Sequence, residues 1–317
     1  MDVSVIIPLF NRKHLIGYTL DSLKPEHHEG VQIQVIVVDD GSTDGAYEFV
    51  KENYSWVSLY RNPKKGAPSA RNFGLFNSTA PFVHFLDSDD LVEKNFFIKK
   101  ISYLKSHNDV SSVYGGWCFF NGNEDFNINQ ISLLYKDYPK EINFNRENHL
   151  CRLLNGWFIP INAFVHRKVN ILQIGGFDEK LKINQDVHLT FKILVNFSII
   201  GIDSGVCYIR NHDNVRVGTI NNKKKFLDLI LLRKAFIKEL ELKNIFSQKL
   251  KNALSEYLFY QWQSYRKVYP KLSKICYSIS VKLNPNYKLN GGTAYKFLGN
   301  LLGNKNAVIL KQSLKRK

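Results

Sequence analysis

The first ninety residues alternate between strand-like and helix-like segments, and each strand-like run ends in polar residues. The two segments between the first runs carry apolar residues at helical spacing. This alternation predicts an α/β fold with a mainly parallel sheet covered by helices on both faces, and ligands bind such sheets at the carboxyl ends of the strands. The runs are "VSVIIPLF" (3–10), "VQIQVIVVDD" (31–40) and "PFVHFLDSDD" (81–90).

The third run ends in a dense acidic cluster, in which Asp87, Asp89 and Asp90 lie within four positions. Carboxylate oxygens suit hard cations such as Mg2+ and Mn2+, and a cation held by one or two carboxylates keeps positions open for substrate phosphates. A helix cap is the alternative, because an aspartate before "LVEKNFFIKKI" would satisfy free backbone amides. A cap explains one aspartate and not three, so we predict a divalent cation site.

The net charge of +16 is distributed unevenly along the chain. Residues 221–317 contain 21 Lys and Arg but 4 Asp and Glu, whereas residues 1–220 contain 23 basic and 24 acidic residues. This break predicts two parts, a near-neutral catalytic domain over 1–220 and a basic, mainly helical region over 221–317 that attracts an anionic partner.

Two other classes of protein deserve comparison with this interpretation. A nucleic-acid-binding protein would suit the pI of about 9.5, but the acidic strand ends would repel DNA and no nucleic-acid motif is present, so we expect no such partner. A nucleotidyltransferase would also use carboxylates and a metal on an α/β sheet. It would be expected to show a glycine-rich loop near the first strand, and "IIPLFNRKHL" has none.

Taken in order, the motifs resemble the family 2 glycosyltransferases, which are inverting enzymes with the GT-A fold. The resemblance covers residues 2–215 and implies metal-dependent transfer from a nucleotide-diphosphate sugar, which we expect to be a UDP-sugar. The implied acceptor is a glycan or lipid-linked oligosaccharide of surface polysaccharide biosynthesis, such as lipopolysaccharide or capsule. The motifs are "VSVIIPLFNR", "VIVVDDGSTD", "GAPSARNFGL", "FLDSDD", "IGGFDEKL", "NQDVHLTFKI" and "YIRNHDN".

The resemblance implies roles for residues on the nucleotide side of the site. Asp40 would accept a hydrogen bond from the nucleotide base, and Pro8 and Phe10 would line the same pocket. Arg71 would lie near the diphosphate or close the base pocket. A surface arginine is the alternative, which its place between two expected anion-binding segments disfavours. Asp87 would face the ribose and the donor sugar.

The metal and the base complete the implied machinery. Asp89 would coordinate Mn2+ or Mg2+, and His212 matches a position that contributes to the metal or pyrophosphate site in many members, although a lone histidine is equally well an ordinary loop residue. Asp186 would be the base that deprotonates the acceptor hydroxyl. The usual glutamate before it is Gln185 here, and His188 replaces another acidic position.

Four residues are expected to border the donor sugar and the acceptor. Gly175, Gly176 and Phe177 belong to "IGGFDEKL", which also has the form of a helix C-cap followed by a turn. Trp157 would stack on a sugar, and a buried core tryptophan is the equally good alternative.

The basic helical region predicts attachment to an anionic membrane surface, because its lysines accompany leucine, phenylalanine and tyrosine. The alternative is a helical cap whose lysines are only solvated. The start of the chain lacks the form of a signal peptide, and no apolar run approaches the about 18 residues needed to span a bilayer. We therefore expect a cytoplasmic protein that attaches peripherally to the inner face of the cytoplasmic membrane.

Overall fold

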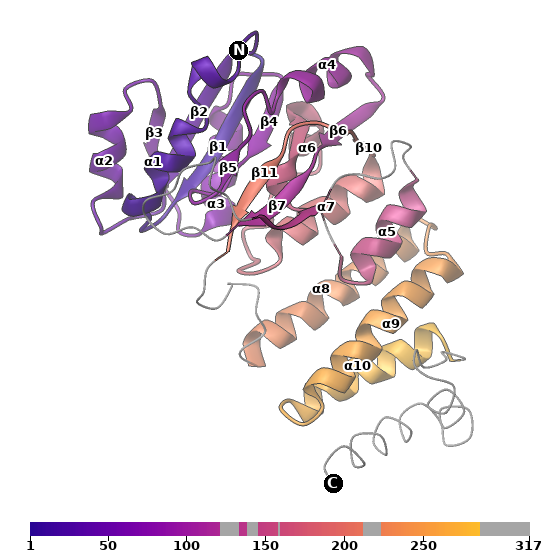
Figure 1. The fold of residues 1–317 in the computed structure, drawn as a ribbon. Coiled ribbons are helices and arrows are strands. Elements are labelled where there is room, and N and C mark those ends of the chain that lie inside the picture. Colours follow the sequence, from indigo (N-terminus) through magenta and orange to yellow (C-terminus); the bar gives the residue numbers. More distant parts are fainter. Residues whose placement is uncertain (121–132, 138–144, 158, 212–222, 286–317) are drawn as a thin grey trace. The chain divides into compact units, whose positions relative to one another are not determined.

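The structure is a computed structural model that describes residues 1–120, 133–137, 145–157, 159–211 and 223–285 (Figure 1). The chain forms two compact units. The first comprises residues 1–146 and 158–219, and the second comprises residues 147–157 and 220–317.

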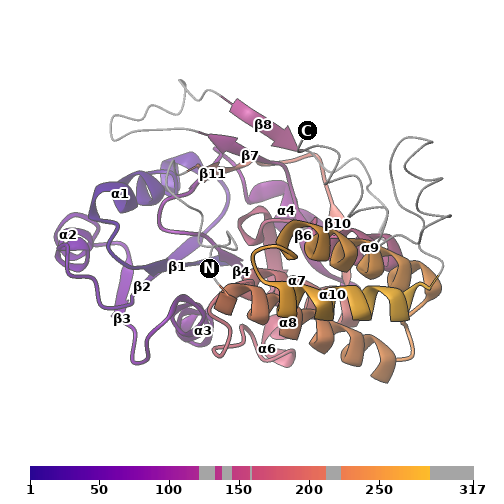
Figure 2. The same ribbon diagram turned by 90° about the horizontal axis from the view of Figure 1, so that it is seen from below.

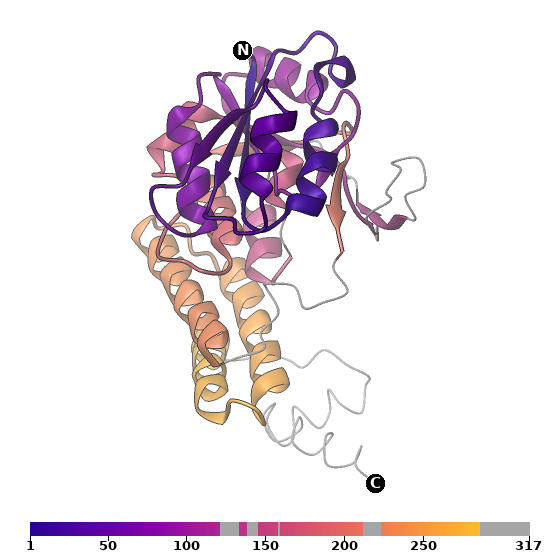
Figure 3. The same ribbon diagram turned by 90° about the vertical axis from the view of Figure 1, so that its left-hand side faces the viewer.

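A seven-stranded sheet with strand order β10-β6-β9-β4-β1-β2-β3 forms the centre of the first unit (Figure 3). Strand β9 is antiparallel to its neighbours β4 and β6, and every other pair in this sheet is parallel. The expected α/β fold with a mainly parallel sheet is confirmed. The strands are β1 (Val3–Leu9), β2 (Ile33–Asp39), β3 (Ser58–Arg61), β4 (Phe82–Phe85), β6 (Val110–Tyr114), β9 (Phe164–Arg167) and β10 (Ser198–Gly201).

Helices cover both faces of this sheet (Figure 2). One face carries α1 (Lys13–Asp21), α2 (Ala46–Asn53) and α4 (Ile98–Ser106), and the other carries α3 (Ala67–Asn77), α6 (Lys168–Gln173) and α7 (Gln185–Asn196). Helix α3 packs closely on β1, because a Cβ atom added at Gly74 would lie 2.4 Å from Cγ2 of Ile6. Two short 3-10 helices, η1 (Pro25–His27) and η3 (Ile161–Ala163), complete the connections.

A second sheet has four strands in the order β5-β11-β7-β8. Its first strand begins directly after Asp90, and helix α4 begins only at Ile98. The interpretation of these aspartates as a helix cap is therefore wrong, because the residues that follow them are extended. The strands are β5 (Leu91–Val92), β7 (Trp117–Phe120), β8 (Leu133–Asp137) and β11 (Cys207–Arg210).

Lys100 of α4 is fully buried and holds the turn that precedes β11. Its Nζ donates to the carbonyl oxygens of Phe96, Ser204 and Gly205 at 3.1, 3.0 and 3.1 Å. Burial lowers the pKa of Lys100 to about 7. These three hydrogen bonds fix the start of β11, the strand that brings Arg210 to the acidic cluster.

The described residues of the second unit are mainly helical. Serine side chains join α9 to α10, where Ser255 Oγ donates to the carbonyl of Ser280 at 2.9 Å and Ser280 Oγ donates to that of Ser255 at 2.8 Å. No helix in the described part of the chain is both long and apolar enough to cross a membrane. The helices are α5 (Arg146–Leu154), α8 (Lys223–Leu242), α9 (Gln248–Tyr265) and α10 (Pro270–Leu283).

Candidate active site

The two aspartates at the end of β2 hold the loops beside them. Asp39 is buried and accepts hydrogen bonds from the backbone amides of the turn that follows it. The carboxylate of Asp40 accepts from the Gly66 amide at 2.8 Å and from Asn62 Nδ2 at 2.7 Å. Asp40 thus fixes the loop before α3 in this structure, and its contact with a nucleotide base remains a prediction.

The end of β1 lies against the same loop system. The Asp40 amide donates to the carbonyl of Leu9 at 2.7 Å, and the Thr43 amide donates to Asn11 Oδ1 at 2.8 Å. Pro8 lies within β1, and Phe10 follows that strand with 54% of its surface exposed. An exposed aromatic ring at this edge is available for contact with a planar ligand.

Two carboxylates of the acidic cluster face arginines. Arg71 Nη2 donates to Asp87 Oδ1 at 2.5 Å, and Arg12 Nε donates to Asp89 Oδ2 at 3.4 Å. The Asp87 side chain is 40% exposed and that of Asp89 is 15% exposed. Both carboxylates can therefore be reached from the strand-end edge.

The third carboxylate of the cluster, Asp90, is buried and structural. It accepts a short hydrogen bond from Asn162 Nδ2 and one of 2.8 Å from the Arg210 amide. Burial raises the pKa of Asp90, and the negative charges of Asp89 and Asp87 raise it further. The three carboxylates are thus close enough to repel one another.

This donor set fits a hard divalent cation that is completed by substrate oxygens. Asp87 and Asp89 offer carboxylate oxygens, and a nearby cation would relieve the repulsion among the carboxylates that raises the pKa of Asp90. Within the described residues, no group of three or more His, Cys, Asp or Glu side chains could hold a metal by itself. His212 lies outside the described residues, so its expected part in the metal site stays a prediction.

Asp186 lies in the first turn of α7 and is half-buried. Its Oδ1 accepts from the Val187 amide at 2.8 Å. Burial raises the pKa of Asp186, the charge of Arg71 lowers it and that of Asp87 raises it. The structure therefore brings Asp186, Arg71 and Asp87 within electrostatic reach of one another, although they come from three separate motifs.

Arg71 has unused hydrogen-bonding capacity in this site. The residue is 6% exposed, and its guanidinium carbon lies 5.3 Å from the centre of the Phe177 ring. Its Nε and Nη1 are buried and have no hydrogen-bond partner. Buried donors of this kind are costly unless something satisfies them, so a surface-arginine interpretation of Arg71 is wrong.

The expected wall residues take the conformations that their motif predicts. Gly175 and Gly176 both have positive φ, at 74° and 60°, as expected for a turn after a helix. Phe177 is buried and packs edge-to-face on Phe85 at 4.9 Å. Trp157 belongs to the second unit, where the Arg152 guanidinium lies 5.2 Å from its ring centre.

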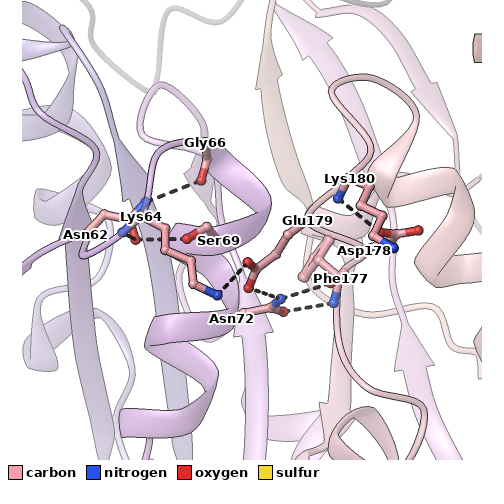
Figure 4. Close-up of polar contacts among 9 residues, drawn as sticks. All are labelled: Asn62, Lys64, Gly66, Ser69, Asn72, Phe177, Asp178, Glu179 and Lys180. Atoms are coloured by element: carbon pink, nitrogen blue, oxygen red, sulfur yellow. Dashed lines mark hydrogen bonds and ion pairs between the residues drawn. The ribbon is translucent and has the colours of Figure 1, made fainter.

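Sequence reasoning missed three residues that hold this site together, Lys64, Asn72 and Glu179 (Figure 4). Asn72 Oδ1 accepts from the Phe177 amide at 2.8 Å, and Lys64 Nζ lies 3.1 Å from Glu179 Oε2. The available signal was their position, since Asn72 directly follows Arg71 and Glu179 ends the "GGFDE" stretch.

Comparison with known proteins identifies relatives of the chain. The sequence model of "Glycosyl transferase family 2" matches residues 4–171. The glycosyltransferase YibD of Escherichia coli is 34% identical over 121 residues, covering 37% of this chain and 35% of YibD. The minor teichoic acid biosynthesis protein GgaA of Bacillus subtilis is 26% identical over 305 residues, covering 90% of this chain and 60% of GgaA.

The fold of the chain is also similar to that of a protein of known structure. The crystal structure of S. aureus TarS 1–349 in complex with UDP-GlcNAc superposes with a TM-score of 0.66 and 17% identity, covering 100% of this chain and 92% of TarS 1–349. At that identity the match shows the fold. The chain spans 16 to 35% of the length of the first curated relatives that it matches.

Proposed function

The chain belongs to glycosyl transferase family 2 and is a transferase, and from this premise we propose that it transfers a sugar from a nucleotide-diphosphate donor with inversion. Arg71 is the observation that carries the proposal. Its Nε and Nη1 are buried without partners beside Asp87, and a diphosphate supplies the charged acceptors that such donors need. We expect a UDP-sugar, in line with the UDP-GlcNAc bound by TarS.

Asp186 is the base of the proposed reaction. It takes the proton of the acceptor hydroxyl as the oxygen attacks the anomeric carbon, and the bond between that carbon and the diphosphate oxygen breaks. The electron pair leaves with the nucleoside diphosphate, whose negative charge Arg71 stabilises. Burial raises the pKa of Asp186, which makes the carboxylate a stronger base than an exposed aspartate.

A divalent cation, Mn2+ or Mg2+, is the proposed cofactor. Asp89 would hold it, with His212 as a further candidate ligand, and Asp87 would face the ribose and the donor sugar. When bound, such a cation neutralises charge on the diphosphate. Arg12, which faces Asp89 at 3.4 Å, would have to release that carboxylate for a ligand.

The proposed contacts with the nucleotide are made by Pro8, Phe10 and Asp40. The proposed contacts with the sugar are made by the wall residues Gly175, Gly176 and Phe177 and by Trp157. The acceptor we propose is a hydroxyl of a glycan or lipid-linked oligosaccharide of a surface polysaccharide. The match with GgaA, which covers 90% of this chain, supports this class of pathway.

The second unit offers a surface for an anionic membrane. Five residues of α8 at positions i, i+4, i+7, i+11 and i+15 are exposed, and we name them the α8 outer face: Leu227, Leu231, Lys234, Lys238 and Leu242. The three leucines are 39, 52 and 68% exposed. Leucine side chains can enter a lipid interface while lysines meet anionic headgroups, which supports peripheral attachment at the inner face of the cytoplasmic membrane.

Calorimetric titration with UDP, GDP and dTDP, each with Mn2+ and with EDTA, tests the donor and the metal together. We expect UDP to bind with Mn2+ and to bind weakly with EDTA. Equal binding in both conditions would reject the metal, and tighter binding of another nucleotide would reject a UDP-sugar. The Asp89→Ala variant should lose the Mn2+-dependent part of the affinity, whereas Asp109→Ala, on an exposed loop, should keep it.

Substitution of Arg71 tests its proposed contact with the diphosphate. Arg71→Met should weaken UDP binding by about tenfold or more, because a charge-assisted hydrogen bond to a phosphate is removed. Arg61→Met is the matched control, since Arg61 is an exposed arginine paired with Glu48 at 3.5 Å. Equal affinities in the two variants would contradict the assignment of Arg71 to the diphosphate.

A further inference from the structure

Helix α3 is tied at its beginning to the loop on the nucleotide side. The Gly66 amide, one residue before the helix, donates to Asp40 at 2.8 Å. In the first turn, Ser69 Oγ donates to Asn62 Oδ1 at 3.1 Å (Figure 4). The loop that carries Asn62 and Gly66 is therefore fixed to the start of α3.

The next turn of α3 reaches in the other direction, to the loop between α6 and α7. Asn72 is buried, and its side chain makes three hydrogen bonds. Its Oδ1 accepts from the Phe177 amide at 2.8 Å, and its Nδ2 donates to the Phe177 carbonyl at 2.9 Å and to Glu179 Oε1 at 3.2 Å. One side chain thus replaces a backbone partner for both polar groups of Phe177 (Figure 4).

Glu179 joins the two loops directly. Its other oxygen lies 3.1 Å from Lys64 Nζ, in the loop before α3. Hydrogen bonds from Asn72 and then from Lys64 lower the pKa of Glu179. The glutamate is therefore ionised at neutral pH and links the helix to the nucleotide-side loop.

The same loop is held from its other side by the helix that carries the base. Lys192 of α7 donates through Nζ to the carbonyl oxygens of Ile174 and Gly176 at 2.6 and 2.7 Å. A Cβ atom at Gly176 would lie 2.5 Å from Asn72 Oδ1. The loop is consequently packed between α3 and α7 without room for a larger residue at this position.

We propose that Asn72 and Glu179 are positioning residues of the transfer reaction, which hold the 174–180 loop and the start of α7 in register with α3. The inference rests on the proposed role of Asp186 as base. We call the hydrogen bonds of Asn72 and Glu179 the clamp. Asp40 and Arg71 lie on the nucleotide side of the clamp and Asp186 on its other side, so the clamp fixes the spacing between the proposed donor site and the proposed base. A misplacement of about 1 Å can cost on the order of 100-fold in rate.

Kinetics of Asn72→Ala, with Asn77→Ala as control, test the clamp. Asn77 lies on the same helix and is exposed, and its side chain donates to the Phe73 carbonyl of that helix at 2.8 Å. We expect kcat of Asn72→Ala to fall by about 100-fold, with the donor KM and the dissociation constant of UDP unchanged. Asn77→Ala should keep the wild-type kcat. A fall in UDP affinity that matches the fall in kcat would overturn a positioning role.

Two substitutions of Glu179 separate its hydrogen bond from its ion pair. Glu179→Gln keeps an acceptor for Asn72 and loses the ion pair, which is exposed and worth little, so kcat should stay near the wild-type value. Glu179→Ala loses both and should lower kcat, by less than Asn72→Ala does. Equal kcat values for the two Glu179 variants would contradict the role of this glutamate.

Hydrogen exchange decides the proposal independently of turnover. Asn72→Ala should accelerate amide exchange in residues 174–187, and UDP should slow exchange there in the wild type and in Asn77→Ala but not in Asn72→Ala. Unchanged exchange in Asn72→Ala would overturn the clamp even if activity falls. A wild-type protein that transfers no sugar would reject the proposed function, whereas the exchange result would still show whether Asn72 holds the loop.

Discussion

The two units of this protein use charge in opposite ways. In the first unit, charged side chains from distant parts of the sequence meet at the strand ends, as when Arg12 contacts Asp89 at 3.4 Å. In the second unit, the basic residues of α8 largely face solvent. Buried charge interacts strongly because water does not screen it, whereas exposed charge acts at long range and weakens with salt.

This contrast places the proposed chemistry in the first unit and the proposed membrane association in the second. A carboxylate whose pKa is shifted by burial can act as a base near neutral pH, as we propose for Asp186. Exposed lysines with ordinary hydration suit contact with a large anionic surface. The contrast predicts that substitutions in the first unit change rate and stability, and that those on the α8 outer face change association.

Replacing Asp186 should have the largest effect. Asp186→Asn removes the base and leaves the proposed phosphate site intact, so kcat should fall by about 100-fold to 10,000-fold, with UDP affinity unchanged. Burial raises the pKa of Asp186, and the base works when deprotonated. The wild-type activity should therefore decline with falling pH from a value above the ordinary range of an aspartate.

Steady-state kinetics and calorimetry of Asp186→Asn measure these two quantities. Asp109→Asn, at an exposed position, is the matched control and should behave as the wild type. Turnover retained in Asp186→Asn would show that another group takes the proton. The buried charge of the first unit would then no longer explain the chemistry of transfer.

Buried histidines should make the first unit sensitive to acid. Burial lowers the pKa of His84 and of His166 to about 3 each, from an ordinary value of 6.5. The unfolded chain binds protons on these histidines between pH 6.5 and about 3 and the folded chain does not. The free energy of unfolding therefore falls as the pH falls through that window, by several kcal/mol, since one pKa unit corresponds to about 1.4 kcal/mol.

The His166→Leu variant isolates this contribution. Leucine suits the space between Phe85 and Phe164, whose ring centres lie 5.9 and 5.1 Å from that of His166, and it cannot bind a proton. Chemical denaturation at pH 6.5 and at pH 4 should show a smaller loss of stability in His166→Leu than in the wild type. His107→Leu, at an exposed histidine, should match the wild type. Equal losses in all three proteins would contradict the assignment.

The α8 outer face should show an effect on binding and none on stability. Leu231→Asp replaces an exposed apolar side chain by a negative charge and should weaken binding to vesicles with anionic lipid by roughly tenfold or more. Val268→Asp, at a position that is 63% exposed, is the control for the added charge. Vesicle sedimentation at low and high salt measures both. Equal binding of wild type and Leu231→Asp would reject membrane attachment through this face.

The sequence predicted the sheet and the edge that carries the site because both depend on local patterns. Apolar runs that end in "DDGSTD" and "DSDD" identify strands and their carboxyl ends, and "IGGFDEKL" identifies a turn by its glycines. The hydrogen bonds of Asn72 were not predictable, since Asn72 and Phe177 are 105 positions apart and no local pattern records their contact.

Helix α5 was missed for a related reason. Its residues 147–154 belong, together with residues 155–157, to the second unit, whose other part begins only at residue 220, and no local pattern records that distant packing. The proposed roles of Asp40 and Asp89 illustrate another limit. A motif identifies a carboxylate, but not whether Asn62 and Gly66, or Arg12, already occupy it.

Substitution of Arg233 in α8 should have the smallest effect on stability. This residue is an exception to the contrast between the units, because it is a buried charge in the second unit. It is 5% exposed, and its Nε and Nη1 have no partner. Its guanidinium carbon lies 4.7 Å from the centre of the Tyr257 ring and 5.2 Å from that of Phe236. Burial lowers the pKa of Arg233, and Tyr257 opposes the shift.

Arg233→Met should leave the free energy of unfolding within about 1 kcal/mol of the wild type. Methionine keeps apolar contact with the two rings, and the loss of the cation–ring attraction and of the hydrogen bond with Tyr257 is offset by removal of a poorly solvated charge. Denaturant unfolding followed by tryptophan fluorescence measures the change. A loss of about 3 kcal/mol or more would mean that a compensated charge had been broken, and the distinction between buried charge in the first unit and solvated charge in the second would no longer hold.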